Sequence, residues 1–362
     1  MNSKFLVCEE TGTVIHADDR RILHYGFEDF VASIVQSDDC FICGAENGSK
    51  PFSNEHVIPK WIMKHYCKPD GFMVLPNGSN IKHIHYTVGC CQDCNGELSE
   101  LFEKPISDLL KNDYNFVADA IAQDESLYVK LFHWACLLFF KTHLKDSYLV
   151  AERDRRVPSG SIADTYCWHP LYHIHQIIRS YHTGAVLMDG IQGTIVVFEA
   201  LDEGPEEQFD YLDNLNSQIV MVKVGKNVIL AVLNDSRFCL AGYRTFLSRI
   251  NGALTSIQIR ELFARLRHLN DNIKRRPTFY SLFKNNQFIL GAKVPKKIEF
   301  FSIKREKSSL FKFMRFYLGE IMPLDLPNRE KYLQDLEEGH AWYILDKDQN
   351  FFQHKNYQEL NG

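Results

Sequence analysis

The chain has 362 residues, of which 45 % are hydrophobic and 24 % are charged. This composition excludes a largely disordered chain, and a formal net charge of -5 excludes a protein that is basic throughout. Two or three compact domains are expected at this length. The start MNSKFLVCEETG lacks a secretory pattern, and the apolar run WACLLFF is too short to span a bilayer, so we expect a cytoplasmic protein without a membrane segment.

Residues 1–37 form the first predicted element group. The stretch KFLVCEETGTVIH predicts a short hairpin with Gly12 at its turn, and FEDFVASIV predicts the helix that follows. This segment is interpreted as a cap in front of the next region.

Residues 38–110 are rich in Cys, His, Gly and Asn and contain few long apolar segments. Small domains stabilised by a metal ion have this composition, because the ion supplies folding energy that a small core cannot. We therefore expect a metal-stapled module here.

Four of the ten cysteines occur as two C-x-x-C pairs, Cys40 with Cys43 and Cys91 with Cys94. Cysteines in a chain without an export signal are expected to stay reduced, so paired spacing indicates metal rather than disulfides. Four thiolates complete a tetrahedral Zn²⁺ site and leave no open position, which predicts a structural ion. Cys90 lacks the two-residue spacing and is not expected to be a ligand. Two unrelated pairs of buried cysteines are the alternative.

Between the two pairs, NEHVIP predicts a strand that ends at Glu55 and His56. IKHIHYTVG predicts the return strand, and QDCNGELSELFEK predicts a helix with Asn95 in its first turn. Carboxylate and amide oxygens suit a hard divalent ion, whereas histidine suits proton transfer near neutral pH. This order of strand, strand and helix predicts a site that holds a hydrated cation against a phosphodiester.

These residues resemble the HNH endonucleases, or ββα-metal nucleases, in the subgroup with two C-x-x-C zinc knuckles. The resemblance covers about residues 38–105. It implies that Glu55 and Asn95 bind a catalytic Mg²⁺ or Mn²⁺ and that His56 is the general base that deprotonates the attacking water. It also implies cleavage to a 5′ phosphate and a 3′ hydroxyl, with DNA as the expected substrate.

The pattern departs from that family at two places. Many members have an asparagine about five residues before the second cysteine pair, where this chain has Tyr86 and Thr87; Asn77 or Asn80 is the candidate replacement.

On the helix, some members have a further ligand four residues after the first, where this chain has Ser99. Glu103 shares the helix face of Asn95, but eight residues of helix rise about 12 Å. Glu103 is therefore expected to lie behind the ligands rather than to share one ion with Asn95.

Two further groups of histidines each have two interpretations. His83 and His85 alternate on the predicted return strand, which favours surface positions, with contact to metal or DNA as the alternative. The stretch CWHPLYHIHQIIRSYH, residues 167–182, is interpreted as a packed segment because its spacing fits no zinc pattern. The alternative is a second metal site. Its ligands would be Cys167, His169, His173 and His175.

Residues 111–152 are predicted to be a helical connector, because apolar residues recur at helical spacing. RDRRVPSGS, residues 153–161, marks the boundary to an α+β accessory domain that extends to residue 362. Strands are expected in GAVLMDG, GTIVVFEA, SQIVMVKVGKNVILAVLND, YSLFKNNQFILGAKV and IEFFSI, and a helix in TSIQIRELFARLRHLNDNI.

Charge is unevenly distributed in this accessory domain. Residues 199–213 contain seven acidic residues and no lysine or arginine, whereas residues 274–315 contain twelve basic and two acidic residues. The basic segment predicts contact with nucleic-acid phosphates, with a solvated charged face as the alternative.

Together these patterns predict an α+β protein with an N-terminal zinc-stapled ββα-metal module, then helices and a larger mixed domain. The expected function is a metal-dependent endonuclease whose accessory domain selects substrate or regulates cleavage. The alternatives are a non-catalytic, zinc-dependent nucleic-acid binding module and a regulated effector in defence against foreign DNA.

Overall fold

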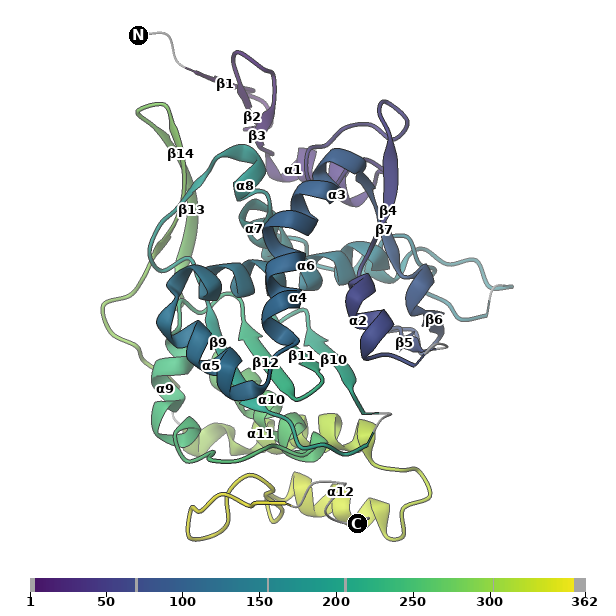
Figure 1. Cartoon of the computed structure of the whole chain (residues 1–362), viewed down its shortest axis with the longest axis vertical. Helices are drawn as coiled ribbons and strands as arrows, with labels where there is room; N and C mark the ends of the chain where they lie inside the picture. The colour runs from purple at the N-terminus through teal and green to yellow at the C-terminus, as the bar shows by residue number, and fades with distance from the viewer. Residues whose placement is uncertain (1–3, 69–70, 155, 205–206, 302, 355–362) are drawn as a thin grey trace. The chain divides into compact units, whose positions relative to one another are not determined.

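The computed structural model of the chain describes residues 4–68, 71–154, 156–204, 207–301 and 303–354. Helices alternate with several small sheets, which confirms the predicted α+β class (Figure 1). Among the described residues, no helix combines the length and apolar content needed to cross a membrane.

The chain divides into two compact units, each built from several segments. Unit 1 comprises Met1–Leu109, Ser126–Ile191 and Phe279–Lys293. Unit 2 comprises Leu110–Glu125, Gln192–Thr278 and Val294–Gly362. The domain boundaries predicted at residues 37, 110 and 152 divide the chain into consecutive segments, and they stay predictions.

Unit 1 contains short strands around a long buried helix. Its strands are β1 (Phe5–Val7), β2 (Val14–His16), β3 (Ile22–His24), β4 (Phe52–His56), β5 (Phe72–Val74), β6 (Asn80–Lys82), β7 (Thr87–Cys91), β8 (Val186–Leu187), β13 (Thr278–Lys284) and β14 (Gln287–Lys293). Its helices are α1 (Phe27–Phe30), α2 (Lys60–His65), α3 (Gln92–Leu98), α4 (Lys104–Leu110), α6 (Glu125–Asp146), α7 (His169–Ile178) and α8 (Ser180–Thr183).

The predicted N-terminal hairpin is confirmed by the antiparallel pairing of β1 with β2, with Gly12 in the left-handed region at a φ of 75°. The predicted helix after it is α1, which continues as a π-helical turn over Val31–Val35.

The hairpin between the two cysteine pairs is formed by β4 and β7, and α3 follows β7 directly. The pairing is antiparallel and runs from Phe52 opposite Cys91 to His56 opposite Thr87. The return strand is shorter than predicted. His83–His85 form a 3₁₀ turn closed by the Tyr86 amide on the His83 carbonyl, so these histidines do not alternate on a strand.

The helix α6 is buried on every side over most of its length, from Leu131 to Leu144. A helix surrounded by other elements is apolar all round, as the sequence WACLLFF predicts. Lys141 is the charged residue of this stretch, and its side chain is fully buried.

Unit 2 is a four-stranded antiparallel sheet in the order β10, β11, β12, β9, packed against helices. Its strands are β9 (Thr194–Glu199), β10 (Phe209–Asn214), β11 (Ile219–Val224) and β12 (Asn227–Val232), and its helices are α5 (Tyr114–Gln123), α9 (Phe238–Leu247), α10 (Ser256–Asp271), α11 (Ile303–Ile321) and α12 (Arg329–Glu337). The predicted hairpin of β11 and β12 and the predicted helix α10 are confirmed.

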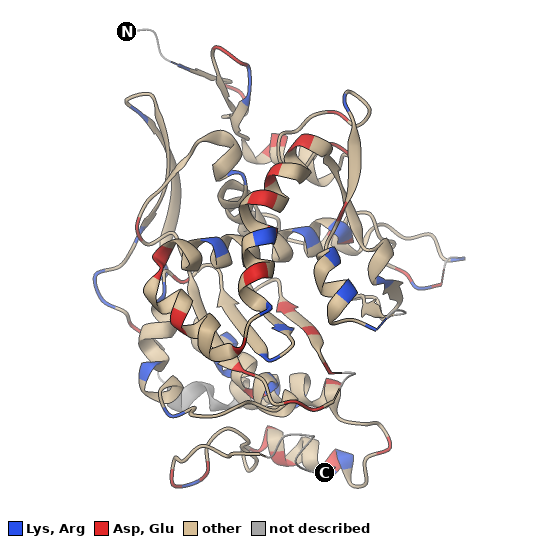
Figure 2. Cartoon of the chain, viewed as in Figure 1, with Lys and Arg blue, Asp and Glu red and all other residues tan. Residues whose placement is uncertain are grey.

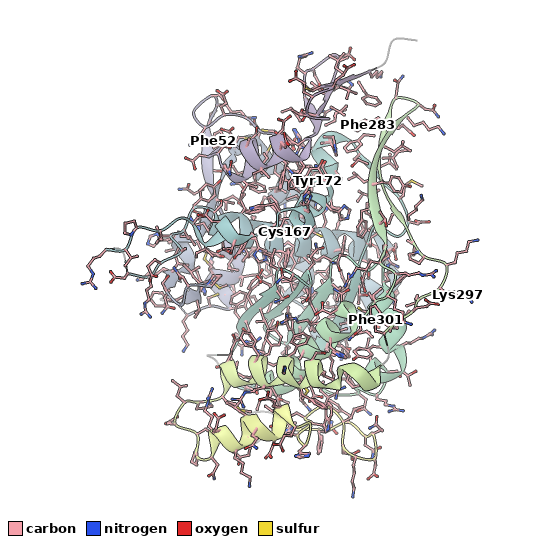
Figure 3. The ribbon with its side chains drawn as sticks, turned by 180° about the vertical axis from the view of Figure 1, so that it is seen from behind. Phe52, Cys167, Tyr172, Phe283, Lys297 and Phe301 are labelled. Carbon is pink, nitrogen blue, oxygen red and sulfur yellow. The ribbon has the colours of Figure 1, made fainter. Side chains whose placement is uncertain are left out.

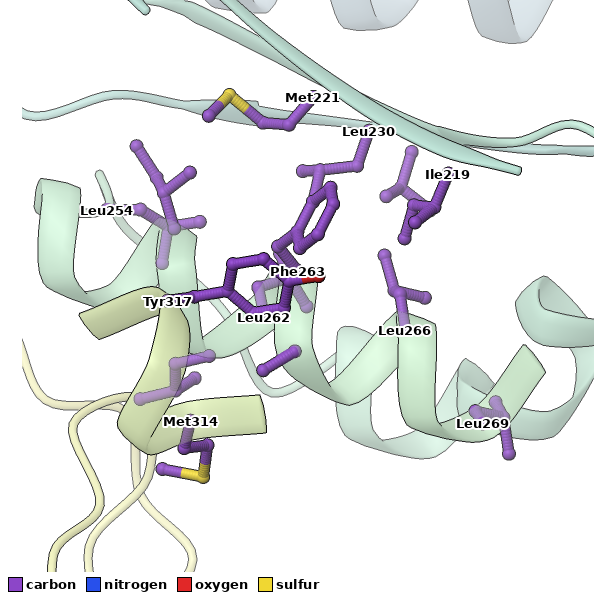
Figure 4. Packing of buried hydrophobic residues seen from close by; sticks show 14 of the residues in the cluster. Ile219, Met221, Leu230, Leu254, Leu262, Phe263, Leu266, Leu269, Met314 and Tyr317 are labelled. Carbon is purple, nitrogen blue, oxygen red and sulfur yellow. The ribbon is translucent and has the colours of Figure 1, made fainter. Parts of the chain in front are cut away.

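The core of unit 2 lies between the sheet and α10. Figure 4 shows Met221 and Leu230 of the sheet above Phe263 of α10, and Tyr317 of α11 packs edge-on against Phe263 with ring centres 4.8 Å apart. The predicted strand in IEFFSI is wrong. Phe300 makes an isolated bridge with Ile273, and α11 starts at Ile303.

Candidate metal centre and the hairpin between its ligands

The four cysteines of the two C-x-x-C pairs come together in unit 1. Their sulfur atoms all lie within 4.8 Å of one another, and those of Cys43 and Cys91 are 3.8 Å apart. Cys40, Cys91 and Cys94 are buried, and Cys43 is half-buried. Four sulfur atoms at this separation fit a tetrahedral zinc ion, so the predicted ligand set is confirmed as a cluster suited to metal.

The first cysteine loop depends on a glycine. Gly44 has a φ of 73°, and a side chain there would collide with the Tyr25 hydroxyl. Its amide donates to the Cys40 carbonyl at 2.8 Å, and the Cys40 amide donates to the Ala45 carbonyl at 2.9 Å. This tight turn holds Cys40 and Cys43 together because only glycine tolerates the conformation and the close approach.

The helix α7 supports the same loop from behind. Nε2 of His175 hydrogen-bonds the Phe41 carbonyl at 2.8 Å, and Nε of Arg179, just after α7, donates to the Ile42 carbonyl at 2.5 Å. Both side chains are fully buried. They satisfy the carbonyls of the two residues between the first cysteine pair, which the short loop cannot pair itself.

The stretch from Cys167 to His182 therefore packs rather than chelates. His169 stacks on Phe27 at 3.8 Å between ring centres, and His173 stacks on Phe279 at 3.9 Å. Cys167 is exposed before α7 (Figure 3). Within the described part of the chain, these residues do not belong to any group suited to hold a metal.

Cys90 lies beside the sulfur cluster without belonging to it. Its sulfur is 3.8 Å from that of Cys40 and is buried. Hydrogen bonding to Cys40 and burial raise the pKa of the Cys90 thiol. Cys90 is not among the four cysteines whose sulfur atoms lie within 4.8 Å of one another, consistent with the prediction that it is not a ligand.

Glu55 lies at the centre of a buried charged group. Its side chain is 8 % exposed, and its Oε1 accepts a hydrogen bond from Nζ of Lys141 at 2.6 Å. The same Nζ donates to the His56 carbonyl at 2.7 Å and lies 3.6 Å from Oε1 of Glu103. Two carboxyl groups therefore share one buried ammonium, and we call Glu55, Lys141 and Glu103 the buried triad.

The pKa values of the triad show how its charge is balanced. Burial is the main reason why the pKa of Glu103 is raised to about 7. Lys141 opposes this shift, and the charge of Glu55 contributes to it. Burial alone would lower the pKa of Lys141, but Glu55 and Glu103 together hold it above its usual value. Lys141 is therefore charged at neutral pH, where Glu103 is only partly ionised.

Sequence reasoning did not find Lys141. The signal for it is a lysine inside the apolar stretch CLLFFKTHL, because a buried lysine requires an acidic partner. Glu103 was expected to lie behind the ligands, and in the structure it approaches Lys141, which pairs with Glu55.

His56 ends β4 and is half-buried. Burial lowers the pKa of its ring, and the charge of Lys60 lowers it further, so the ring is neutral at pH 7. Directly after it, α2 exposes Lys60 and Lys64 four residues apart on one helix face (Figure 2). A neutral imidazole therefore lies next to a basic helix.

Asn95 lies on the Glu55 side of the hairpin. Its Nδ2 donates to Oγ of Ser53 at 2.7 Å, and Ser53 and Glu55 share one face of β4. With the amide nitrogen held by Ser53, Oδ1 is the atom of Asn95 that can meet a cation. Among the described residues, Glu55 does not belong to any group of three or more His, Cys, Asp and Glu side chains suited to hold a metal.

The remaining candidates lie outside this arrangement. Tyr86 is buried and its hydroxyl donates to the Thr142 carbonyl, while Nδ2 of Asn77 donates to the Val150 carbonyl at 2.9 Å. His83 is buried and His85 is exposed, both on the 3₁₀ turn.

One other acidic group in the described residues has metal-ligand spacing. It consists of Asp335, Glu338 and His340 in unit 2, and all three are at least partly exposed. Exposed acidic groups of this kind are common without an ion.

In comparisons with known proteins, the chain matches no family model, no curated protein and no solved structure.

Proposed function

We propose that unit 1 carries a metal-dependent endonuclease module of the HNH type, which hydrolyses phosphodiester bonds with DNA as the expected substrate. The observation that carries this proposal is the order β4, β7, α3, with one cysteine pair before the hairpin and the other at its end. In this order, Asn95 contacts the face of β4 that carries Glu55, and β4 ends at His56.

The sulfur cluster would hold a structural zinc ion. Four thiolates fill a tetrahedral coordination sphere and leave no position for substrate or water. Zinc would therefore act on folding, by joining the loop before β4 to the start of α3, and would take no part in the reaction.

His56 supplies the proton acceptor in this proposal. A ring that is neutral at pH 7 and half-exposed can take a proton from a water molecule, and its backbone carbonyl is fixed by Lys141. A general base of this kind contributes about 10² to 10⁴ in rate.

A catalytic Mg²⁺ or Mn²⁺ fits the oxygen atoms on the Glu55 side of the hairpin. Oε1 of Glu103 accepts no hydrogen bond but lies 3.6 Å from Nζ of Lys141, and Asn95 retains Oδ1, so hard ligand atoms are present beside Glu55. Mg²⁺ is usually held by one or two carboxylates and keeps several waters. When bound, the ion would neutralise charge that develops on the phosphate and the leaving oxygen.

Phosphate contact is the expected role of the basic residues nearby. Lys60 and Lys64 are exposed on α2, directly after the strand that carries His56. Each phosphate neutralised by such a residue releases counterions and so adds affinity. Unit 2 is proposed to select the substrate or regulate cleavage, which includes a role in defence against foreign DNA.

The buried triad favours a second candidate, a non-catalytic nucleic-acid binding module that needs zinc. Lys141 neutralises Glu55 and is fully buried, so an ion at Glu55 must compete with an existing ion pair. In this alternative the hairpin and α2 bind phosphates, and the triad only stabilises the fold.

Cleavage of supercoiled plasmid, single-stranded DNA and RNA, each with Mg²⁺ or Mn²⁺, separates the two candidates. We expect nicking or cutting by the zinc-loaded protein and a loss of about 10² to 10⁴ in rate for His56→Ala. The matched control is His85→Ala, an exposed histidine of the same hairpin region. Nucleic-acid binding without cleavage by the zinc-loaded protein would favour the binding module.

A further inference from the structure

Unit 2 contains a pocket that the proposed function does not use. Its volume is about 680 Å³, and it lies between α9, α10, the start of α11 and the segment 340–352. Pockets that hold small organic ligands are about 300 to 1,000 Å³ in volume. The pocket is therefore large enough for a mononucleotide-sized molecule.

Aromatic rings form much of the pocket wall. They come from α9, the segment just before α11, α11 itself and the segment after α12. Among them are Tyr243, Phe246, Phe301, Phe311, Trp342 and Phe352.

Two of these rings are left in contact with solvent. Phe301, labelled in Figure 3, is 48 % exposed and Phe352 is 42 % exposed. Exposed aromatic rings at a concave site cost free energy that a flat apolar ligand recovers on binding. The wall therefore favours a ligand with an aromatic ring.

A fixed positive charge lies in the same wall. The guanidinium carbon of Arg265 is 4.6 Å from the centre of the Trp342 ring and 4.8 Å from that of Phe246. Its Nε donates to Oε1 of Glu261 at 2.7 Å, and the fully buried Glu261 also accepts the Tyr343 amide at 2.6 Å. Arg265 is thus held in place before any ligand arrives, which reduces the entropy cost of binding an anion.

The remaining polar groups complete the chemistry of the site. Lys347 adds an exposed ammonium, whereas the carboxylate of Asp346 accepts the amides of Asp348 and Asn350 at 2.8 Å each. Asn272 adds an amide group to the wall, and its Nδ2 donates to the His268 carbonyl at 2.9 Å. The pocket thus combines ring-stacking surfaces, an amide group and two cationic side chains, of which Arg265 is ion-paired with Glu261.

We propose that this pocket of unit 2 binds a nucleoside monophosphate, with the base among the aromatic rings and the phosphate at Arg265 and Lys347. Bases stack on aromatic rings and on arginine planes, and amide side chains pair with their edges. A ligand without a phosphate would contact only the aromatic rings, and an anion without a ring would contact only the cationic side chains.

Isothermal titration calorimetry on the zinc-loaded, full-length protein tests this proposal with AMP, GMP, CMP and UMP. We expect at least one of them to bind with a Kd below about 1 mM, and the matching nucleoside to bind at least about tenfold more weakly. Orthophosphate and octanoate are the probes for an anion alone and for an aliphatic acid.

Two variants locate the site. Phe301→Ala combined with Phe352→Ala is expected to weaken the monophosphate at least about tenfold, and Lys347→Ala is expected to weaken the monophosphate but not the nucleoside. All three residues are exposed or partly exposed, so the fold is expected to tolerate the changes. The matched control is Phe316→Ala, a 57 % exposed phenylalanine outside the pocket.

The proposal is overturned if no monophosphate binds, if the paired phenylalanine variant binds as the unchanged protein does, or if octanoate binds more tightly than every monophosphate. None of these results depends on cleavage, so the pocket and the proposed nuclease module are tested separately.

Discussion

The hairpin of β4 and β7 in unit 1 and the sheet β9–β12 in unit 2 are both antiparallel, but different forces stabilise them. The hairpin has two strands, a cluster of four sulfur atoms at one end and a buried ion triad beside it. The sheet has four strands, and β11 and β12 are buried at every position against a large apolar cluster.

The hairpin and the sheet differ in where they can carry polar functional groups. A two-stranded hairpin is at best marginally stable by itself, so an ion and charged side chains must supply what the missing core cannot. A small element held this way can carry a half-buried imidazole and a half-buried amide beside a buried carboxylate. The sheet of unit 2 is held by its core instead, and its candidate ligand site lies among the helices.

Removal of the metal should give the largest loss of stability, and this loss should be confined to the hairpin region of unit 1. Cys94→Ser is expected to abolish stoichiometric zinc binding and to unfold the hairpin region, because a structural zinc site contributes about 10 to 16 kcal/mol of apparent binding free energy. Zinc analysis and hydrogen exchange measured on the same sample check this, with exchange in β9–β12 expected to stay protected. Cys167→Ser, at an exposed cysteine, is the matched control.

Loss of the buried ammonium should give the next largest effect. Lys141→Met is expected to lower the free energy of unfolding by about 3 to 5 kcal/mol, because it leaves Glu55 buried and without its partner. Urea denaturation measures this change, and Lys145→Met on the same helix serves as control.

The double variant Lys141→Met with Glu55→Gln separates charge from packing. We expect it to recover much of the lost stability, since the carboxylate that is hydrogen-bonded to Lys141 is removed together with the ammonium. If the double variant is no more stable than Lys141→Met, the ion pair is not the reason for the loss.

A core truncation should affect the sheet of unit 2 alone. Leu262→Ala removes a fully buried side chain of α10 and is expected to cost about 3 kcal/mol through lost burial and a cavity. Denaturation monitored by circular dichroism gives the cost, and zinc analysis is expected to show unchanged metal content. Loss of zinc in this variant would contradict the view that the hairpin of unit 1 and the sheet of unit 2 are stabilised independently of each other.

The smallest expected effect is a pH dependence from Glu103. Its pKa is about 7 in the folded chain, well above its value in an unfolded chain, so the unfolded state releases this proton first as pH rises. The free energy of unfolding should therefore fall between about pH 4.5 and pH 7, by on the order of 2 kcal/mol. Glu103→Gln is expected to flatten this slope in denaturation series without added Mg²⁺, and an unchanged slope would assign it to other groups.

Much of the hairpin region could be predicted because local spacing determines it. Two C-x-x-C pairs, a strand ending in Glu55 and His56, and a helix starting after Cys91 are all readable from short stretches. The continuous apolar runs of β11 and β12 and the helical pattern of α10 were equally informative, since a strand buried on both faces is apolar throughout and a packed helix repeats its apolar residues.

The parts that could not be predicted depend on contacts between distant residues. Lys141 lies 86 residues after Glu55, and no local pattern shows which acidic group a buried lysine will meet. His83–His85 looked like a strand by alternation, but a 3₁₀ turn satisfies their backbone instead. Phe300 lies in the stretch IEFF, which is rich in apolar residues, yet it makes only an isolated bridge before α11 begins.

X-ray absorption at the zinc edge tests most directly whether the sulfur cluster organises the hairpin. For the full-length protein purified with zinc, we expect one ion per chain with four sulfur neighbours at about 2.3 Å, unchanged in His56→Ala. A chain without stoichiometric zinc, or a zinc ion with nitrogen or oxygen in place of one of the four sulfurs, would contradict a closed structural site at Cys40, Cys43, Cys91 and Cys94.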